Sequence, residues 1–133
     1  MRPAPLPVGM RFVGLHHVQI GIPEGSEERA RAFYGEALGL EEIPKPAHLA
    51  VRGGLWFRAG EHEVHLGIEF DHRALARAHP AFRVEDLDAL RQRLRDHGVE
   101  PYDDLPLPGH RRFYAKDPFG NRLEFLEPVP PKP

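Results

Sequence analysis

The stretch GLHHVQIGI at residues 14–22 decides how the rest of the chain is interpreted. Val18, Ile20 and Ile22 fall on one side of an alternating pattern, and His17 falls on the other. Alternation with a period of two is typical of a β-strand that lays one face against a hydrophobic core. The opposite face would then present His17 to something more polar than the core.

A helix and three further strands are expected after this first strand. Ser26 is a typical helix N-cap residue, and Gly39 is a typical residue just after a helix end. Apolar residues recur between them at helical spacing. The strands that follow are expected at residues 40–46, 54–59 and 63–69, the first at a sheet edge because it contains two prolines.

The same order of elements then returns. A strand is expected at residues 79–84, followed by a helix that Asp86 caps and Gly98 ends. Strands are expected after it at residues 99–103, 111–115 and 121–127, the last two joined by the turn sequence DPFGN at 117–121.

Matching positions support an internal duplication. His17 and His79 are 62 positions apart, while His65 and Glu124 are 59 apart. Two units at an offset of about 60 residues are typical of a repeated module. We therefore predict an α+β fold with two βαβββ modules, at about 12–69 and 79–127 with a connector at 70–78. Together they form one domain of residues 1–133, with a curved mixed sheet around a cavity.

Composition excludes several classes of protein. The chain has 133 residues, 18 basic and 20 acidic residues, and no cysteine. A net charge of −2 argues against a nucleic-acid-binding surface, and the lack of cysteine excludes disulfides and thiolate metal sites. No apolar run approaches the roughly 20 residues of a membrane span, and the N-terminus lacks a signal-peptide pattern. A cytoplasmic protein is expected by elimination.

Four residues share one face of corresponding strands. His17 and His79 lie on the first strand of each module, and His65 and Glu124 lie on the last. If the sheets curl and pair, within one chain or across a dimer, these side chains converge. Three imidazoles and a carboxylate suit divalent Zn, Ni, Fe, Co or Mn, which leaves the identity of the metal open. Such an ion could bind a substrate through two adjacent oxygens and act as a Lewis acid.

Each assignment has a plainer alternative. A strand histidine often satisfies its nitrogens locally. His16 competes with His17, although its alternation predicts that it packs beside Val18 and Ile20. The other competitors are His62 for His65, His72 for His79, and Glu69 or Glu127 for Glu124. Four further side chains could line the cavity: Trp56, Arg83, Arg112 and Arg122. The plainer alternative is a wall or core residue for Trp56 and a solvated strand residue for each arginine.

Three motifs carry a resemblance to a known family. LHHV at 15–18, RAFYGEALGL at 31–40 and DPFGNRLEF at 117–125 resemble the glyoxalase/bleomycin-resistance/dioxygenase superfamily, also called vicinal oxygen chelate proteins. The resemblance implies paired βαβββ modules, a homodimer and a small-molecule substrate chelated through vicinal oxygens. It implies four metal ligands, His17, His65, His79 and Glu124. It also suggests that Tyr114 contacts substrate, although a tyrosine packed at the sheet edge fits equally well.

His65 departs from the family pattern. The glyoxalase and epimerase branches often have Glu or Gln at this position, and the extradiol dioxygenase branch uses two His and one Glu. His17, His79 and Glu124 would satisfy that triad, with His65 beside the metal. The resulting hypothesis is a lyase or isomerase in which Glu124 or His65 transfers a proton. The alternatives are an extradiol-type dioxygenase and a non-catalytic, bleomycin-resistance-like protein that binds a drug or metabolite.

Overall fold

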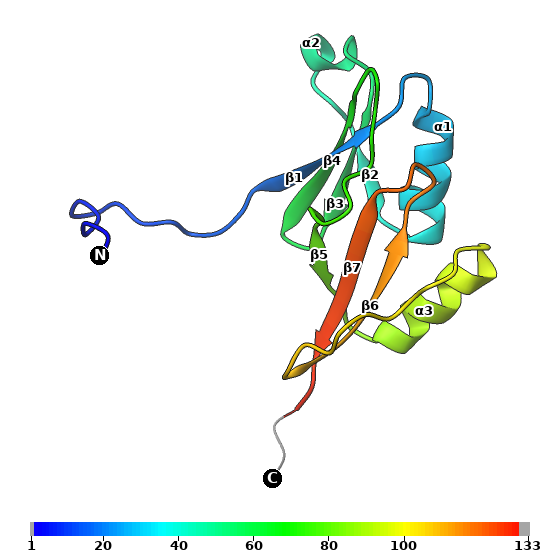
Figure 1. The fold of residues 1–133 in the computed structure, drawn as a ribbon. Coiled ribbons are helices and arrows are strands. Elements are labelled where there is room, and N and C mark those ends of the chain that lie inside the picture. The colour runs from blue at the N-terminus through cyan, green and yellow to red at the C-terminus, as the bar shows by residue number, and fades with distance from the viewer. Residues whose placement is uncertain (1, 131–133) are drawn as a thin grey trace.

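The computed structural model describes residues 2–130 and contains two small β-sheets (Figure 1). The first sheet has the strand order β1 (His17–Ile22), β4 (His62–Ile68), β3 (Leu55–Ala59) and β2 (Glu41–Ile43). The second sheet has the order β5 (Ala81–Arg83), β7 (Arg122–Pro128) and β6 (His110–Lys116). The helices are α1 (Glu27–Ala30), the π-helix η1 (Arg31–Ala37), α2 (Ala47–Ala50) and α3 (Leu87–Asp96). The helices α1 and α3 lie on one side of the sheets, and the short helix α2 lies at one end of the first sheet.

Both sheets are mixed in the same way. β1 runs parallel to β4, which is antiparallel to β3, and β5 runs parallel to β7, which is antiparallel to β6. This confirms two βαβββ-like modules. In the second module the predicted strand at 99–103 is wrong, because Tyr102 forms only an isolated bridge with Tyr114. Pro101, Pro106 and Pro108 lack the N–H groups that a longer ladder would need.

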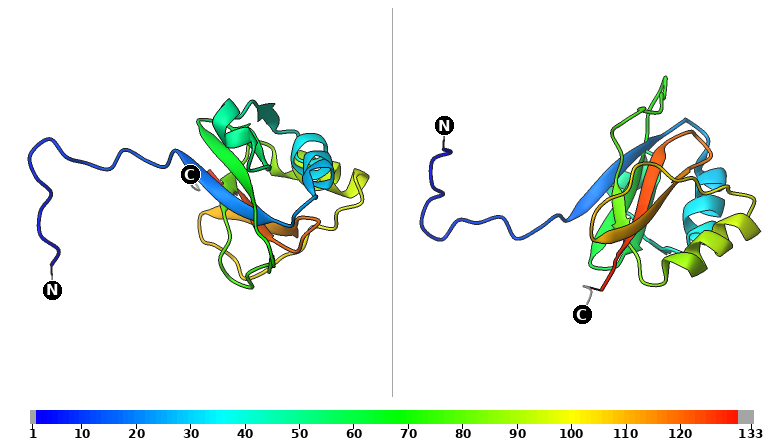
Figure 2. Two further views of the ribbon diagram at one scale, coloured as in Figure 1. Left: turned by 90° about the horizontal axis from the view of Figure 1, so that it is seen from above. Right: turned by 60° about the horizontal axis from the view of Figure 1, so that its bottom comes forward.

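The sheets do not merge into the single curved sheet that was predicted. Within residues 2–130 they are separate sheets (Figure 2). Their apolar faces share one continuous core with the helices. Ile22 and Phe57 contribute from the first sheet, and Phe113 and Leu123 from the second. Burying both apolar faces together turns the polar faces away from the helices.

The helix boundaries agree with the predicted caps in part. Asp86 caps α3 as expected, because its carboxylate accepts a hydrogen bond from the Ala89 N–H at 3.2 Å. Ser26 precedes α1 but does not cap it, since its hydroxyl donates to the Pro23 carbonyl instead. α3 packs onto the first module, and Arg93 donates to the last carbonyls of η1. No helix among residues 2–130 is long and apolar enough to cross a membrane.

The first strand is shorter than predicted. It begins at His17 rather than at residue 14, and residues 2–16 form an extended arm that leaves the body of the molecule (Figures 1 and 2). His16 is therefore exposed, and the prediction that it packs beside Val18 was wrong. The reason is that His16 precedes the first residue of β1, so its side chain lies beyond the end of the sheet and has no core to pack against.

Asp117 links the two modules through a buried hydrogen-bond network. Its carboxylate is only 5% exposed and accepts a hydrogen bond at 2.7 Å from the hydroxyl of Tyr34, which lies on η1. It also accepts the backbone N–H groups of Phe119 and Asn121 at 2.9 and 2.8 Å. The Asn121 amide then donates to the Gly21 carbonyl on β1 at 2.8 Å. The predicted DPFGN turn is thus confirmed and also serves as the joint between modules.

Replacing Asp117 should destabilise the whole fold. In Asp117→Ala the buried Tyr34 hydroxyl and two backbone N–H groups lose their acceptor, so the free energy of unfolding should fall by roughly 2–3 kcal/mol or more. Urea denaturation measures this change. Asp96→Ala, an exposed carboxylate at the end of α3, is the control and should lose little. Equal losses in the two variants would contradict the proposed joint.

Tyr34 should make the stability of the protein depend on alkaline pH. Burial, followed by the charge of Asp117, raises the pKa of Tyr34 well above its usual value. Above about pH 10 the unfolded state ionises this phenol while the folded state does not, so stability is lost as pH rises. Tyr34→Phe should flatten that decline in urea denaturation between about pH 9 and 11. Parallel curves for the two proteins would show that Tyr34 is not the cause.

Candidate functional site

His17 and His65 lie in one column of stacked rings on the polar face of the first sheet. The imidazoles of His17 and His65 stack with centroids 4.1 Å apart, and the Trp56 indole stacks on the other side of His65 at 4.0 Å. The sheet register explains the column, because Trp56 on β3 is directly opposite His65 on β4. Two predicted ligands and one predicted wall residue are therefore brought together.

Glu63 was missed by the sequence analysis, although it lies two residues before His65 and so shares its face. Its carboxylate contacts the Nε2 atom of His65 at 2.9 Å, and this hydrogen bond is the main reason that the pKa of Glu63 is lowered. Partial desolvation, followed by the charges of His65 and His16, lowers the pKa of His17. The His17 imidazole is thus biased toward the neutral form that binds a cation.

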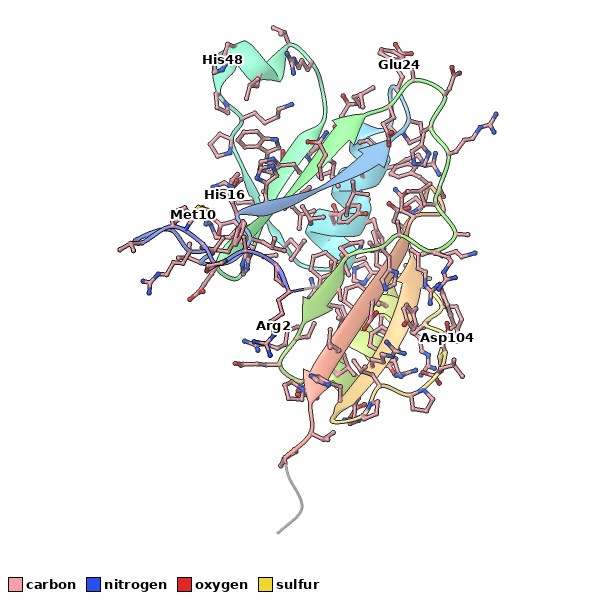
Figure 3. All side chains as sticks on the ribbon, turned by 60° about the vertical axis from the view of Figure 1, so that its left-hand side comes forward. Arg2, Met10, His16, Glu24, His48 and Asp104 are labelled. Carbon is pink, nitrogen blue, oxygen red and sulfur yellow. The ribbon has the colours of Figure 1, made fainter. Side chains whose placement is uncertain are left out.

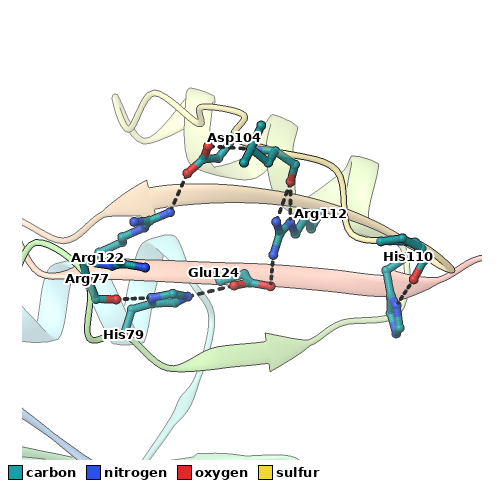
Figure 4. Close-up of polar contacts among 9 residues, drawn as sticks. Arg77, His79, Asp104, His110, Arg112, Arg122 and Glu124 are labelled. Carbon is teal, nitrogen blue, oxygen red and sulfur yellow. Dashed lines mark hydrogen bonds and ion pairs between the residues drawn. The ribbon is translucent and has the colours of Figure 1, made fainter.

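His79 and Glu124 form a second pair beside the second sheet (Figure 4). The predicted strand at 79–84 was too long, because β5 begins only at Ala81 and His79 lies in the segment before it. His79 Nδ1 lies 2.6 Å from the Arg77 carbonyl, and a carbonyl can only accept, so Nδ1 carries a hydrogen. His79 Nε2 lies 2.8 Å from Glu124 Oε1. In a neutral imidazole with its hydrogen on Nδ1, Nε2 can only accept, and so can the Glu124 carboxylate. A proton or a cation between Nε2 and Oε1 would therefore make this short contact favourable.

Glu124 is ionised by its surroundings. Burial alone would raise the pKa of this carboxyl, but hydrogen bonds from His79 and Arg112 outweigh burial and hold the pKa below its usual value. Arg112 Nη1 lies 3.3 Å from Glu124 Oε2. Glu127, the alternative ligand, is occupied elsewhere, because its carboxylate accepts the backbone N–H groups of Asp86 and Leu87 at the start of α3.

Tyr114 on β6 lies directly opposite Glu124 on β7. The guanidinium groups of Arg112 and Arg122 lie over its ring, 5.4 and 4.2 Å from the centroid. Burial, followed by the charge of Glu124, raises the pKa of Tyr114, so the phenol stays protonated at neutral pH. Arg83, in contrast, is exposed on the edge strand β5.

The four predicted ligands do not meet in a single chain. They form two pairs, His17 with His65 and His79 with Glu124, and residues 2–130 contain no group of three or more His, Cys, Asp or Glu side chains that could hold a metal ion. A groove of about 990 Å³ contains none of the four predicted ligands, and Leu75, Val99, Lys116 and Arg122 are among the residues that line it. One chain thus presents two half-sites.

Of the competing histidines, His62 and His72 lie outside both half-sites, whereas the Nδ1 atom of His16 lies 2.9 Å from that of His17. His62 is exposed at the start of β4, where it pairs with Ala59 across the hairpin. His72 lies in the connector, and its Nε2 contacts the Asn121 side chain at 3.1 Å. The preference for His65 and His79 over these two residues stays a prediction.

Comparison with known proteins gives consistent results. The profile described as Glyoxalase/Bleomycin resistance protein/Dioxygenase superfamily matches residues 14–125. A protein from Bacillus anthracis, provisionally assigned to the glyoxalase family, is 50% identical, with 90% of this chain and 98% of that chain covered and a TM-score of 0.87. A glyoxalase family protein from Enterococcus faecalis is 27% identical over 89% of this chain and 100% of that chain, with a TM-score of 0.68.

A more distant structure supports the fold alone. Lactoylglutathione lyase from Agrobacterium tumefaciens is 21% identical, with 88% of this chain and 95% of that chain covered and a TM-score of 0.68. A search of curated proteins gives no match.

The ring column can be tested by fluorescence, because Trp56 is the only tryptophan in the chain. His65→Ala should shift the Trp56 emission to longer wavelength, since water replaces the imidazole that covers one face of the indole. His62→Ala, on the same strand but exposed, is the control and should leave the emission maximum in place. An unchanged maximum in His65→Ala would contradict the stacking.

Proposed function

Because this chain belongs to the glyoxalase/bleomycin resistance protein/dioxygenase superfamily, we propose that it is a metal-dependent enzyme that acts on a small substrate chelated through vicinal oxygens. A lyase or isomerase reaction is the favoured type. The observation that carries the proposal is the presence of two donor pairs, His17 with His65 and His79 with Glu124, at corresponding places in two modules.

The proposed catalytic unit is a homodimer. A divalent metal in a protein commonly has three or four protein ligands, whereas each half-site offers two. A second copy of the chain could place its His79 and Glu124 opposite the first copy's His17 and His65. Two equivalent sites would result, because a two-fold axis repeats every contact.

The donor groups fit a divalent cation. The lowered pKa of His17 favours its neutral imidazole, and the lowered pKa of Glu124 favours its carboxylate. His79 holds its hydrogen on Nδ1 and turns Nε2 toward Glu124, so a cation could take the place of the bridging proton. The bound ion, which could be Zn, Ni, Fe, Co or Mn, would supply Lewis acidity to the two substrate oxygens.

The chain's own residues would handle the proton and the substrate. Glu124 is the proposed proton-transfer base, and Arg112 keeps its carboxylate ionised and oriented. Tyr114, protonated and fixed beside Glu124, could donate a hydrogen bond to substrate. Trp56 would form an apolar wall, and the positive charge of Arg112 would suit an anionic group on the substrate.

Whether His65 binds the metal distinguishes the lyase or isomerase proposal from an extradiol-type dioxygenase. As a ligand, His65 would have its ring orientation fixed by Glu63, as ligating histidines commonly do through a carboxylate. However, that contact uses the Nε2 atom of a ring that also lies between Trp56 and His17. If His65 does not bind the metal, His17, His79 and Glu124 make a two-histidine, one-carboxylate set, and an extradiol-type dioxygenase becomes the second candidate.

Metal content tests the proposal. Purified protein should hold about one divalent ion per chain, and both His17→Ala and Glu124→Ala should lose most of it, while His62→Ala should keep it. Elemental analysis after refilling with each of the five metals gives the measurement. Wild-type protein that binds none of them would contradict the enzyme proposal and redirect the work toward drug or metabolite binding.

Mixing the two deficient variants tests the dimer. If each site draws on two chains, a heterodimer of His17→Ala and Glu124→Ala has one intact site and one doubly damaged site. Random exchange of chains should therefore restore about a quarter of the wild-type metal content. A site built within one chain would gain nothing on mixing, so unchanged metal content after proven chain exchange would refute the shared site.

A further inference from the structure

The N-terminal arm is the least explained part of the molecule. The side chains of residues 2–16 are exposed throughout. A backbone hydrogen bond from Met10 to Pro7 closes a turn within the arm, and the His16 carbonyl accepts the Glu63 N–H where the arm joins the first sheet. Figure 3, in which Arg2, Met10 and His16 are labelled, shows the arm leaving the body at the start of β1. The superfamily match begins only at residue 14, so most of the arm is an addition to the family domain.

The arm is also unusually apolar for an exposed segment. Of the eleven large apolar side chains that are exposed among the described residues, six lie in the arm: Leu6, Val8, Met10, Phe12, Val13 and Leu15. Such a concentration of exposed apolar surface marks an interaction site. A standard interface removes roughly 800 Å² from each partner, and six such side chains supply much of that apolar area.

We propose that the arm of one chain docks on residues 99–109 of a second copy and closes the edge of the shared site. This inference rests on the proposed function, because that function requires His17 of one copy to lie beside His79 and Glu124 of the other. His17 is the first residue of β1, so the arm begins at the proposed ligand itself. At roughly 3.3 Å per residue, the few residues just before His17 can reach across the neighbouring surface of the second copy.

The receiving segment lies directly over the second half-site. Arg112 Nε donates to the Leu105 carbonyl at 3.1 Å, and Arg122 Nη2 contacts Asp104 at 2.8 Å (Figure 4). Tyr102 stacks on Tyr114 with ring centroids 5.7 Å apart. The Leu105 side chain is 75% exposed and offers an apolar contact at this edge.

Charge complementarity favours the same pairing. The arm carries Arg2 and Arg11 and has no acidic residue between positions 2 and 16. Residues 99–109 carry Glu100, Asp103 and Asp104 and have no basic residue. Each of these carboxylates forms an ion pair within its own chain, with Arg95, Arg91 and Arg122 respectively, yet all three remain exposed at the surface. Opposite charges on the two segments would steer the arm onto this edge of a second copy.

Disulfide trapping tests the docking, because the chain has no cysteine of its own. Val8→Cys, Met10→Cys and Phe12→Cys would each be mixed with Leu105→Cys and oxidised. Only contacts between different chains can produce the mixed disulfide. Val51→Cys, exposed to 85% at the end of α2, replaces Leu105→Cys in the control mixture. The positions that change are all exposed, so the protomer should fold normally.

The expected result is a mixed disulfide dimer with Leu105→Cys from at least one arm position, at several times the control yield. Trypsin should also cut the bond after Arg11 more slowly as protein concentration rises. Metal content is measured on the same samples. Metal-loaded dimers with yields equal to the control would overturn the arm docking and leave the proposed function standing. A metal-free monomer would overturn both.

Discussion

The buried carboxylate of Asp117 holds the two modules in one arrangement, and the rest of the structure depends on that joint. A buried charge is tolerated only when hydrogen bonds replace its lost hydration. Asp117 obtains them from Tyr34 on η1 and from its own turn, while Asn121 extends the network to Gly21 on β1. The joint thus fixes the helix side of both modules together and leaves both polar faces outward.

That arrangement explains why the candidate site comes in halves. The apolar faces of the two sheets share a core with the helices, so the faces that carry His17 and Glu124 cannot close on each other within one chain. Under the proposed function, a second copy supplies the missing half. The same geometry gives the arm its proposed role, because a segment that begins at His17 must continue across whichever chain completes the site.

Hydrogen bonds from neighbouring residues orient the side chains of each half-site, and sequence patterns did not predict these bonds. The Arg77 carbonyl fixes the tautomer of His79, and Glu63 orients His65. Arg112 was expected to face the cavity, but its hydrogen bond to Glu124 and its anchor on the Leu105 carbonyl depend on a loop path that periodicity does not predict. These contacts join residues whose proximity follows from the fold rather than from spacing along the chain.

The sequence by itself determined most of the strands and helices, the repeat and the family. Alternation placed His17, His65 and Glu124 on polar strand faces, and turn chemistry located DPFGN, because both depend on neighbouring residues. Only the tertiary structure decided that there are two sheets, that His16 is exposed, that Tyr102 forms a single bridge, and that the four predicted ligand residues lie in two pairs. The physical reason is that module packing is set by the shared core and the Asp117 joint, which connect residues 83 positions apart.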